Sequence, residues 1–334
     1  MSTHLSNTYV KFWGVRGSHP TPGMTTVGYG GNTACVEVSL NGQTIILDAG
    51  TGLIALGREL AARSYQAKQP IEATILFSHL HHDHTQGFPF FQPAYIPTAR
   101  LRFFGPDSFQ DNLESVLARN QTPPMFPVTL KEMASAKEIC TVQQGDVILL
   151  DDKGAALRRG NSALSENTIS VRIHHSYAHP GGTLVYRIEG GGVSLVYATD
   201  VEGYVGVDRR LANFARGADL LIHDAQYSDE HYRGQLAGFP ATQGYGHSTT
   251  SMACELAAAA GVKQLVLFHH DPNYDDEAIA AQETHARTLF PNVYAAYEGL
   301  EIPLGNNHHP EIARQSFLPH AQPVSLAAAR SALA

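Results

Sequence analysis

Short apolar segments bounded by glycine, proline or polar turn residues recur along the whole chain, and this pattern predicts β-strands. In the N-terminal part, strands are predicted at residues 9–15, 34–40, 44–47, 71–77 and 101–104. The dipeptide Asn41-Gly42 separates two of them and favours a tight hairpin. Leucines at helical spacing from Leu53 to Leu60 predict a helix to about residue 66, and another helix is predicted over residues 108–119.

The C-terminal part repeats this arrangement, with strands that often precede helices. Strands are predicted at residues 169–174, 183–188, 193–197, 219–222, 264–268, 293–297 and 300–303, and helices at residues 249–260 and 276–290. The pattern weakens from about Gly305 onward. We therefore expect one domain over residues 1–304 and a peripheral C-terminal tail over residues 305–334.

The strand predicted at residues 71–77 leads into an unusually polar segment. Four histidines and one aspartate occupy six consecutive positions, from His79 to His84. Buried imidazoles and carboxylates need partners or a cation to offset their desolvation. Neutral imidazole nitrogens and carboxylate oxygens are also ligands that divalent zinc accepts. The segment therefore predicts a metal site, with His79 and His81 on the same side of an extended backbone.

Further side chains that can bind a metal lie in loops or at the ends of predicted strands downstream. The complete set of seven potential ligands is His79, His81, Asp83, His84, His179, Asp200 and His269. Neighbouring histidines leave alternatives open, because His174 and His175 lie shortly before His179, and a shift of one position would exchange His269 for His270. We favour His269 because it directly follows the predicted strand at residues 264–268.

Three other features have two interpretations each. Asp48 either orients the metal-binding segment or serves as a turn or helix-capping carboxylate. The aromatic and proline-rich segment 88–97 either walls a substrate pocket or packs in the core or at a dimer interface. Arg16 either meets a phosphate or forms a structural ion pair, and we favour the ion pair.

Composition and charge narrow the possible environments and partners. The 31 acidic and 23 basic residues give a formal net charge of −8, which argues against a surface built to hold long nucleic acid. Cys35, Cys140 and Cys254 are widely separated and suggest neither a disulfide framework nor a thiolate zinc site. No apolar stretch approaches the ~20 residues of a membrane helix, and the N-terminus lacks a signal-peptide pattern. A cytoplasmic location is expected, with no membrane partner.

The ordered ligand series resembles the signature of the metallo-β-lactamase superfamily, whose H-x-H-x-D-H motif is matched from His79 to His84. The resemblance implies an α/β fold, a four-layer αβ/βα sandwich of two mixed sheets with outer helices. It also implies two divalent metal ions, zinc or alternatively manganese. The implied assignment is one ion held by His79, His81 and His179, a second held by Asp83, His84 and His269, and Asp200 bridging both.

Two later segments, 220–225 and 246–249, resemble those of ribonuclease Z and related phosphodiesterases. The resemblance implies that His247 acts at the scissile phosphate and is oriented by Asp224, and we group both with Asp83 as catalytic residues. A carboxylate that hydrogen-bonds one imidazole nitrogen favours the imidazolium, which can protonate a leaving oxygen. Ser248 and the N-terminus of the following helix suit a phosphate oxygen. Otherwise His247 would be a packed residue at a helix start, and we expect His223 to be a core histidine.

These observations predict a binuclear hydrolase in which a metal-bridging hydroxide attacks phosphorus. Small phosphodiesters, such as cyclic nucleotides or short nucleotide esters, are the expected substrates. Long nucleic acid is not expected, because no basic or glycine-rich arm that would grip RNA is recognisable, and a homodimer is plausible. The alternatives are a thioester or lactone hydrolase and a non-catalytic sensor that binds a nucleotide or metal.

Overall fold

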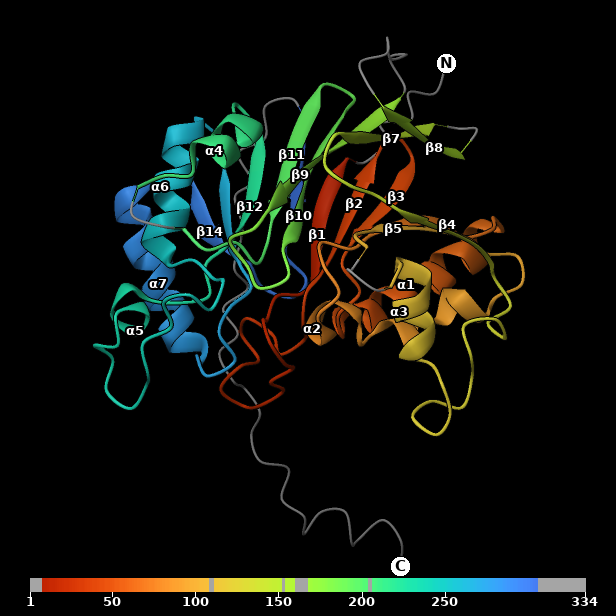
Figure 1. The fold of residues 1–334 in the computed structure, drawn as a ribbon, viewed down its shortest axis with the longest axis horizontal. Coiled ribbons are helices and arrows are strands. Elements are labelled where there is room, and N and C mark those ends of the chain that lie inside the picture. Colours follow the sequence, from red (N-terminus) through yellow and green to blue (C-terminus); the bar gives the residue numbers. More distant parts are fainter. Residues whose placement is uncertain (1–7, 108–110, 152–153, 160–167, 204–205, 306–334) are drawn as a thin grey trace, which may run out of the picture.

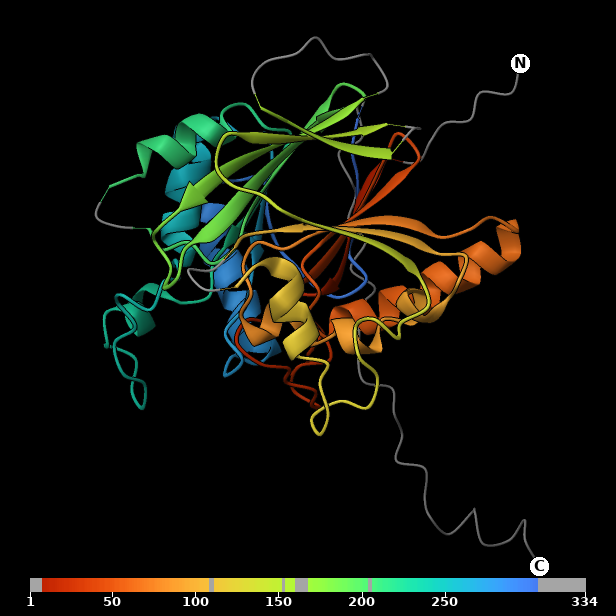
Figure 2. The same cartoon turned by 45° about the vertical axis from the view of Figure 1, so that its right-hand side comes forward.

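Two mixed β-sheets pack face to face in the computed structural model, with helices on the outer face of each sheet (Figures 1 and 2). The structure describes residues 8–107, 111–151, 154–159, 168–203 and 206–305. Within these residues the strands form one sheet of seven strands and one of eight. This arrangement confirms the predicted four-layer sandwich. The predicted C-terminal tail, apart from Gly305, lies outside the described residues.

The first sheet begins with antiparallel strands and continues with parallel ones. Its strands, in spatial order, are β15 (Glu301–Pro303), β1 (Tyr9–Gly14), β2 (Cys35–Leu40), β3 (Gln43–Leu47), β4 (Glu72–Leu76), β5 (Arg100–Gly105) and β6 (Ala136–Thr141). Pairing is antiparallel from β15 to β3 and parallel from β3 to β6. The carboxyl ends of β3 and β4 therefore lie at the same edge of this sheet.

The second sheet likewise has an antiparallel part and a parallel part. Its strands, in spatial order, are β14 (Val293–Ala295), β13 (Leu265–Phe268), β12 (Leu220–Asp224), β11 (Val193–Ala198), β10 (Thr183–Gly190), β9 (Ile169–Ser176), β7 (Asp146–Asp151) and β8 (Gly154–Arg159). The strands from β11 to β14 pair in parallel, and the remaining neighbours are antiparallel. The carboxyl ends of β11, β12 and β13 consequently share one edge, which is where active sites of parallel sheets form.

Helices cover the outer face of each sheet. The first sheet carries α1 (Gly52–Ala67), the short α2 (His82–Thr85), the 3₁₀ helices η1 (Phe88–Phe90) and η2 (Gln92–Tyr95), and α3 (Leu113–Arg119). The second sheet carries α4 (Arg209–Ala215), α6 (Thr250–Ala260) and α7 (Asp276–Leu289) on the opposite side of the molecule in Figure 1, where α5 (Asp229–Tyr232) lies in a projecting loop. None of the helices in the described part of the chain is long and apolar enough to cross a membrane.

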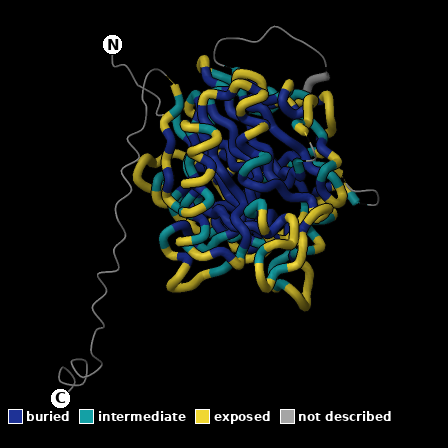
Figure 3. The backbone as a smooth tube through the Cα atoms, turned by 90° about the vertical axis from the view of Figure 1, so that its left-hand side faces the viewer, coloured by how far each residue is buried: buried dark blue, intermediate teal, exposed yellow. Residues whose placement is uncertain are grey.

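The largest apolar cluster lies between the two sheets, where the backbone trace in Figure 3 is almost entirely buried. Two hydrogen bonds also join the sheets directly beside the polar segment. The Tyr186 hydroxyl donates to the carbonyl of Phe77 at 2.6 Å, and the Leu184 amide donates to the carbonyl of Ser78 at 2.8 Å. The packed interface between the sheets therefore fixes the point at which β4 ends.

The sequence pattern missed three strands and three short α-helices. The region 136–159 forms β6, β7 and β8, and the missed helices are α2, α4 and α5. Polar residues interrupt the apolar runs of these segments, so the sequence pattern did not predict them. In β7, for example, buried and half-buried residues alternate. The helix predicted over residues 108–119 begins at Leu113, because Asn112 caps it by accepting from the Ser115 amide.

The aromatic segment 88–97 packs in the core. Phe88 and Phe91 are buried against α1 and the first sheet, and Gly57 on α1 leaves room for the Phe91 ring. No residue of this segment lines the large cavity described below. Of the two interpretations of this segment, packing agrees with its position.

Phe268, the last residue of β13, should contribute strongly to stability. Its buried ring contacts Phe12 in the first sheet and Tyr197 in the second. Phe268→Ala should lower the free energy of unfolding by about 3–5 kcal/mol because it leaves a cavity between the sheets. Met125→Ala, at an 85% exposed position, should change it by less than about 0.5 kcal/mol. Equal denaturant midpoints for the two variants would contradict this account of the core.

Candidate metal centre and active site

The seven predicted ligands lie together at the edge where the parallel strands of both sheets end. His79 and His81 follow β4, Asp83 and His84 lie on α2, His179 lies between β9 and β10, Asp200 follows β11, and His269 follows β13. Segments that are distant in sequence meet here because every contributing parallel strand points its carboxyl end at this edge. All of these side chains except His81 are buried.

A first group of ligand atoms consists of three imidazole nitrogens. His79 Nε2 lies 2.9 Å from His81 Nδ1, and His179 Nε2 lies 3.1 Å from the same atom. Burial and the neighbouring His84 lower the pKa of His79, which favours its neutral, metal-binding form. The three nitrogens converge on one point, as they would around a single cation.

A second group combines Asp83, His84 and His269. Asp83 Oδ2 lies 3.3 Å from His84 Nε2 and 3.2 Å from His269 Nε2, and the two imidazole nitrogens are 3.2 Å apart. Asp200 lies between the two groups. Its Oδ2 is 3.3 Å from His84 Nε2, whereas its Oδ1 is 3.7 Å from His79 Nε2. One carboxylate oxygen thus faces each group, which suits the predicted bridging role.

The outer nitrogens of the imidazoles are bound to acceptors. His84 Nδ1 lies 2.8 Å from Asp48 Oδ2, His179 Nδ1 lies 3.1 Å from the Gly246 carbonyl, and His269 Nδ1 lies 3.0 Å from Gln226 Oε1. These contacts place the ring proton on Nδ1 and leave the Nε2 lone pair directed into the centre. Converging lone pairs and carboxylate oxygens fit divalent cations, zinc foremost, whereas without a cation they would face one another.

Asp48 organises the centre from behind. Its buried carboxylate accepts hydrogen bonds from the Ser78 amide at 2.7 Å, the Ser78 hydroxyl at 2.7 Å and the Tyr197 hydroxyl at 2.8 Å, in addition to His84. Ser78 Oγ lies 3.1 Å from His79 Nδ1 and so connects Asp48 to a second imidazole. Of the two roles considered for Asp48, orientation of the metal-binding segment agrees with its contacts.

Three residues of the centre adopt left-handed backbone conformations. The φ angles of Asp48, Asp200 and His269 are 60°, 54° and 64°. Residues other than glycine seldom adopt left-handed backbone conformations without a compensating interaction. Each of the three follows the end of a parallel strand, and the left-handed turn directs its side chain toward the centre.

The N-terminal segment after β1 supports the second group. A Cβ at Gly17 would lie 2.4 Å from the His269 ring, so only glycine fits there, and the Ser18 amide donates to Asp83 Oδ2 at 2.7 Å. Arg16 is buried and donates to the carbonyls of Gly30, Asp271 and Tyr274. The favoured ion pair for Arg16 is therefore wrong, because carbonyl oxygens take its hydrogen bonds and hold the loop after His269.

His247 and Asp224 form a pair beside the centre. His247 Nδ1 lies 2.7 Å from Asp224 Oδ2, and the His247 ring stacks on His269 at 5.1 Å. Burial alone would lower the pKa of His247, but the Asp224 carboxylate outweighs burial and raises it to about 9. The amides of Asp200 and Ser248 also donate to Asp224, which fixes the carboxylate. The pair can therefore hold a proton next to the metal ligands.

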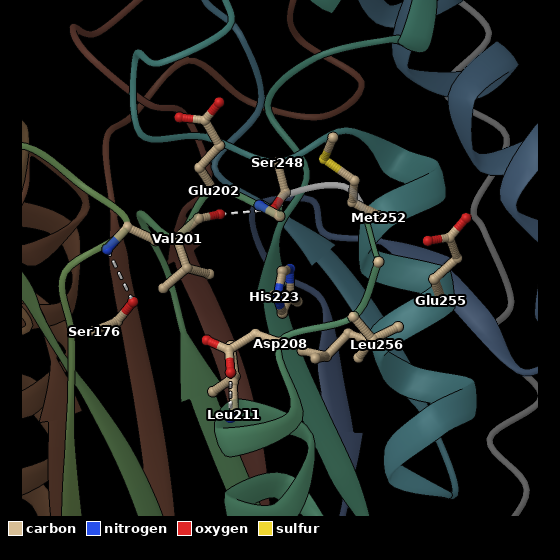
Figure 4. A pocket seen from close by; sticks show the side chains of 14 residues that line it. Ser176, Val201, Glu202, Asp208, Leu211, His223, Ser248, Met252, Glu255 and Leu256 are labelled. Atoms are coloured by element: carbon tan, nitrogen blue, oxygen red, sulfur yellow. Dashed lines mark hydrogen bonds between the residues drawn. The ribbon is translucent and has the colours of Figure 1, made fainter.

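Ser248 does not face a substrate. Its buried hydroxyl donates to the Val201 carbonyl at 2.6 Å and accepts from the Gly203 amide, as Figure 4 shows for the first bond. The adjacent cavity, which His223 also lines, measures about 20 Å³ and has room for about one water molecule. The expectation that Ser248 binds a phosphate oxygen is therefore wrong, since its hydroxyl ties two loops together.

The histidines that were alternatives to the favoured ligands lie elsewhere. His174 packs on Phe214, and His175 packs on Tyr177. His270 Nε2 lies 2.9 Å from the Ala296 carbonyl, outside the centre. His223 is buried with Nδ1 2.7 Å from the Asp224 carbonyl, as expected of a core histidine.

Sequence reasoning missed several residues that support the site. Gln226 orients His269, and Glu202 accepts from the amides of Gly244 and Gly246, which holds the loop that precedes His247. Glu202 is buried only two residues after Asp200. A carboxylate so close to a predicted ligand was the available signal, but its partners lie more than forty residues away in sequence.

Comparison with known proteins places the chain in a family. The beta-lactamase superfamily domain matches residues 43–270, and the chain belongs to the metallo-β-lactamase superfamily. It is 27% identical to a ribonuclease Z of Gemmatimonas aurantiaca, over 88% of this chain and 95% of that protein. A ribonuclease Z of Synechococcus sp. strain CC9311 is 27% identical over 68% of this chain and 80% of that protein.

A solved structure shows the same fold. The metallo-β-lactamase fold protein YhfI from Bacillus subtilis superposes with a TM-score of 0.61 at 17% identity, covering 88% of this chain and 98% of that one. The predicted fold is thereby confirmed, and the relatives named ribonuclease Z confirm the prediction of a metal-dependent hydrolase. The seven ligands and the identity and number of the metal ions stay predictions.

The expectation that long nucleic acid is an unlikely partner is wrong. The relatives that match most of the chain are named ribonuclease Z, a name that states an RNA substrate. The net charge of −8 averages over the whole surface. Phosphate binding depends on the local field, to which bound divalent cations contribute the largest charges.

Asp48→Asn tests the role of the buried carboxylate. An amide group supplies one acceptor oxygen where the carboxylate supplies two, so at least one donor from Ser78, Tyr197 or His84 loses its partner. Metal affinity should fall by about 10–100-fold. Metal content after dialysis against a chelator measures this, with Tyr197→Phe as a milder control. Full retention by Asp48→Asn would contradict the role.

His269 and His270 provide a matched pair for the second metal-binding group. His269→Ala should lose part of the bound metal because it removes one of the predicted ligands, whereas His270→Ala should retain the wild-type metal content. Elemental analysis of the two purified variants measures the difference. Loss of metal from His270→Ala alone would show that the ligand assignment is off by one position.

Proposed function

We propose that this protein hydrolyses phosphodiester bonds at a binuclear metal centre. The observation that carries the proposal is the His247–Asp224 pair, with its 2.7 Å contact, directly beside the two groups of predicted ligands. The names of the ribonuclease Z relatives support the same reaction class. A proton held at this position can be delivered to the departing alkoxide of a phosphodiester.

Each of the two groups of predicted ligands would hold one metal ion. His79, His81 and His179 would hold one ion, Asp83, His84 and His269 would hold the other, and Asp200 offers one oxygen to each group. When bound, divalent ions supply Lewis-acid stabilisation of phosphoryl oxygens and lower the pKa of coordinated water. Asp48 and Gln226 keep the imidazoles in the tautomer that binds a cation.

His247 has a separate role from the ligands. Its Nδ1 donates to Asp224, so the other ring nitrogen, Nε2, remains to deliver a proton to the leaving oxygen. The Asp224 carboxylate raises the pKa of His247 and so favours the protonated imidazole. Asp224 in turn is held by the amides of Asp200 and Ser248, which couples its position to that of a predicted ligand.

Small phosphodiesters, such as cyclic nucleotides and short nucleotide esters, form part of the proposed substrate range. The cavity next to His79, His81 and His179 measures about 1030 Å³ and has room for a nucleotide. Zinc is the proposed metal. A cytoplasmic location and a single catalytic domain over residues 1–304 complete the proposal.

A hydrolysis panel tests the reaction class. Zinc-loaded protein should cleave at least one phosphodiester among bis(p-nitrophenyl) phosphate, a cyclic nucleotide, a short RNA and a precursor tRNA. The same preparation should leave a thioester and a lactone intact. Cleavage of the thioester or lactone without cleavage of any phosphodiester would overturn the proposal in favour of carbonyl chemistry.

His247→Ala tests the proton-donating role. The variant should retain wild-type metal content, because His247 is not among the predicted ligands, and should lower turnover by a factor on the order of 10² or more. His82→Ala, which changes an exposed histidine of the same polar segment, should leave turnover unchanged. Wild-type turnover by His247→Ala would rule out the role.

A further inference from the structure

The large cavity extends from the metal centre to a pair of aromatic rings. His79, His81 and His179 line one part of it, and His175 and Tyr177 line another. His175 is near the end of β9, and Tyr177 begins the loop that leads to His179. A single loop therefore presents both a predicted ligand and an aromatic surface to the same cavity.

The two rings are in contact at a tilted angle. Their centroids are 4.3 Å apart and their planes are inclined by 33°. Tyr177 is 80% exposed, so its other face is free of protein contacts over most of its area. The exposed Tyr177 ring offers a flat apolar surface to a ligand in the cavity. Little conformational entropy is lost when this side chain is fixed, because it has only two torsions.

Gly182 packs closely against His175. A Cβ at this position would lie 2.4 Å from His175 Nε2, and the φ angle of Gly182 is 80°. Glycine at this position therefore leaves room for the imidazole that contacts Tyr177.

The charges around the cavity select against a second phosphate. Among the described residues that line it there is no lysine or arginine, and the acidic Asp107 lies near His175. An anionic group is therefore disfavoured at this end, and the exposed Tyr177 ring offers a flat face to an uncharged one. Every nucleobase has such a face, and stacking of bases on aromatic side chains tolerates different sequences.

We propose that Tyr177, backed by His175, is a stacking platform for a nucleobase next to the phosphodiester that the metal centre binds. This inference rests on the proposed function and adds to it a residue, Tyr177, that would select substrates carrying a nucleobase. Tyr177 is a specificity residue, because its contact is with the base and not with the reacting phosphate. The platform serves equally a free nucleotide ester and a nucleotide within RNA.

Equilibrium binding tests the platform without requiring turnover. The zinc-loaded protein should bind AMP at least about 10-fold more tightly than ribose 5-phosphate, since only AMP carries a base. Tyr177→Ala should abolish this preference by weakening AMP alone, whereas Tyr177→Phe should preserve it. Tyr65→Ala, which removes an 86% exposed tyrosine of α1 outside the cavity, should match the wild type. Isothermal titration calorimetry measures all four proteins.

Equal affinities of the wild type for the two ligands would overturn the platform. So would an unchanged preference in Tyr177→Ala, or an equal loss of both ligands, because a stacking residue acts on the base alone. Failure of the proposed function is distinguishable from these outcomes. A protein that cleaves no phosphodiester refutes that function, while the comparison of AMP with ribose 5-phosphate still decides whether Tyr177 binds a base.

Discussion

The buried carboxylate of Asp48 is the contact on which the rest of the site depends. It receives donors from three segments, namely Ser78 after β4, His84 on α2 and Tyr197 on β11. Asp48 itself follows β3 in the first sheet, whereas Tyr197 belongs to the second. One desolvated group therefore sets both the spacing of the sheets at this edge and the orientation of an imidazole. Such a carboxylate is tolerated in the core only with its hydrogen bonds made, so fold and site are coupled.

The residues with strained backbone conformations lie at the same edge of the sheets. Asp48, Asp200 and His269 all have left-handed φ angles at the ends of parallel strands. Conformations of this kind cost about 1–3 kcal/mol each and persist where surrounding contacts determine them. Here the contacts include the Asp48 network, the Gly17 backbone against His269 and the amide bond from Asp200 to Asp224. The fold thus uses its packed sheets to hold side chains in positions that local sequence preference disfavours.

The sequence predicted most of the fold, because the strands of the central interface are apolar and bounded by clear turns, as β4 and β13 show. The motif from His79 to His84 indicated a metal site because its closely spaced imidazoles and carboxylate are metal ligands, and this holds without knowledge of the fold. Asp48 was left with two interpretations and Gln226 and Glu202 were not assigned, since their roles come from contacts between segments distant in sequence. The exclusion of long nucleic acid failed because total charge does not describe the field at one site. Strands β6 to β8 were missed because polar residues interrupt them.

The central claim is that two metal ions act together with His247 on a phosphodiester. The most direct measurement is a titration of metal-free protein with zinc, in which hydrolysis of bis(p-nitrophenyl) phosphate is followed at each addition. The account predicts that full activity requires two equivalents of zinc per chain. Full activity at one equivalent, or no phosphodiester hydrolysis at any zinc concentration, would contradict it.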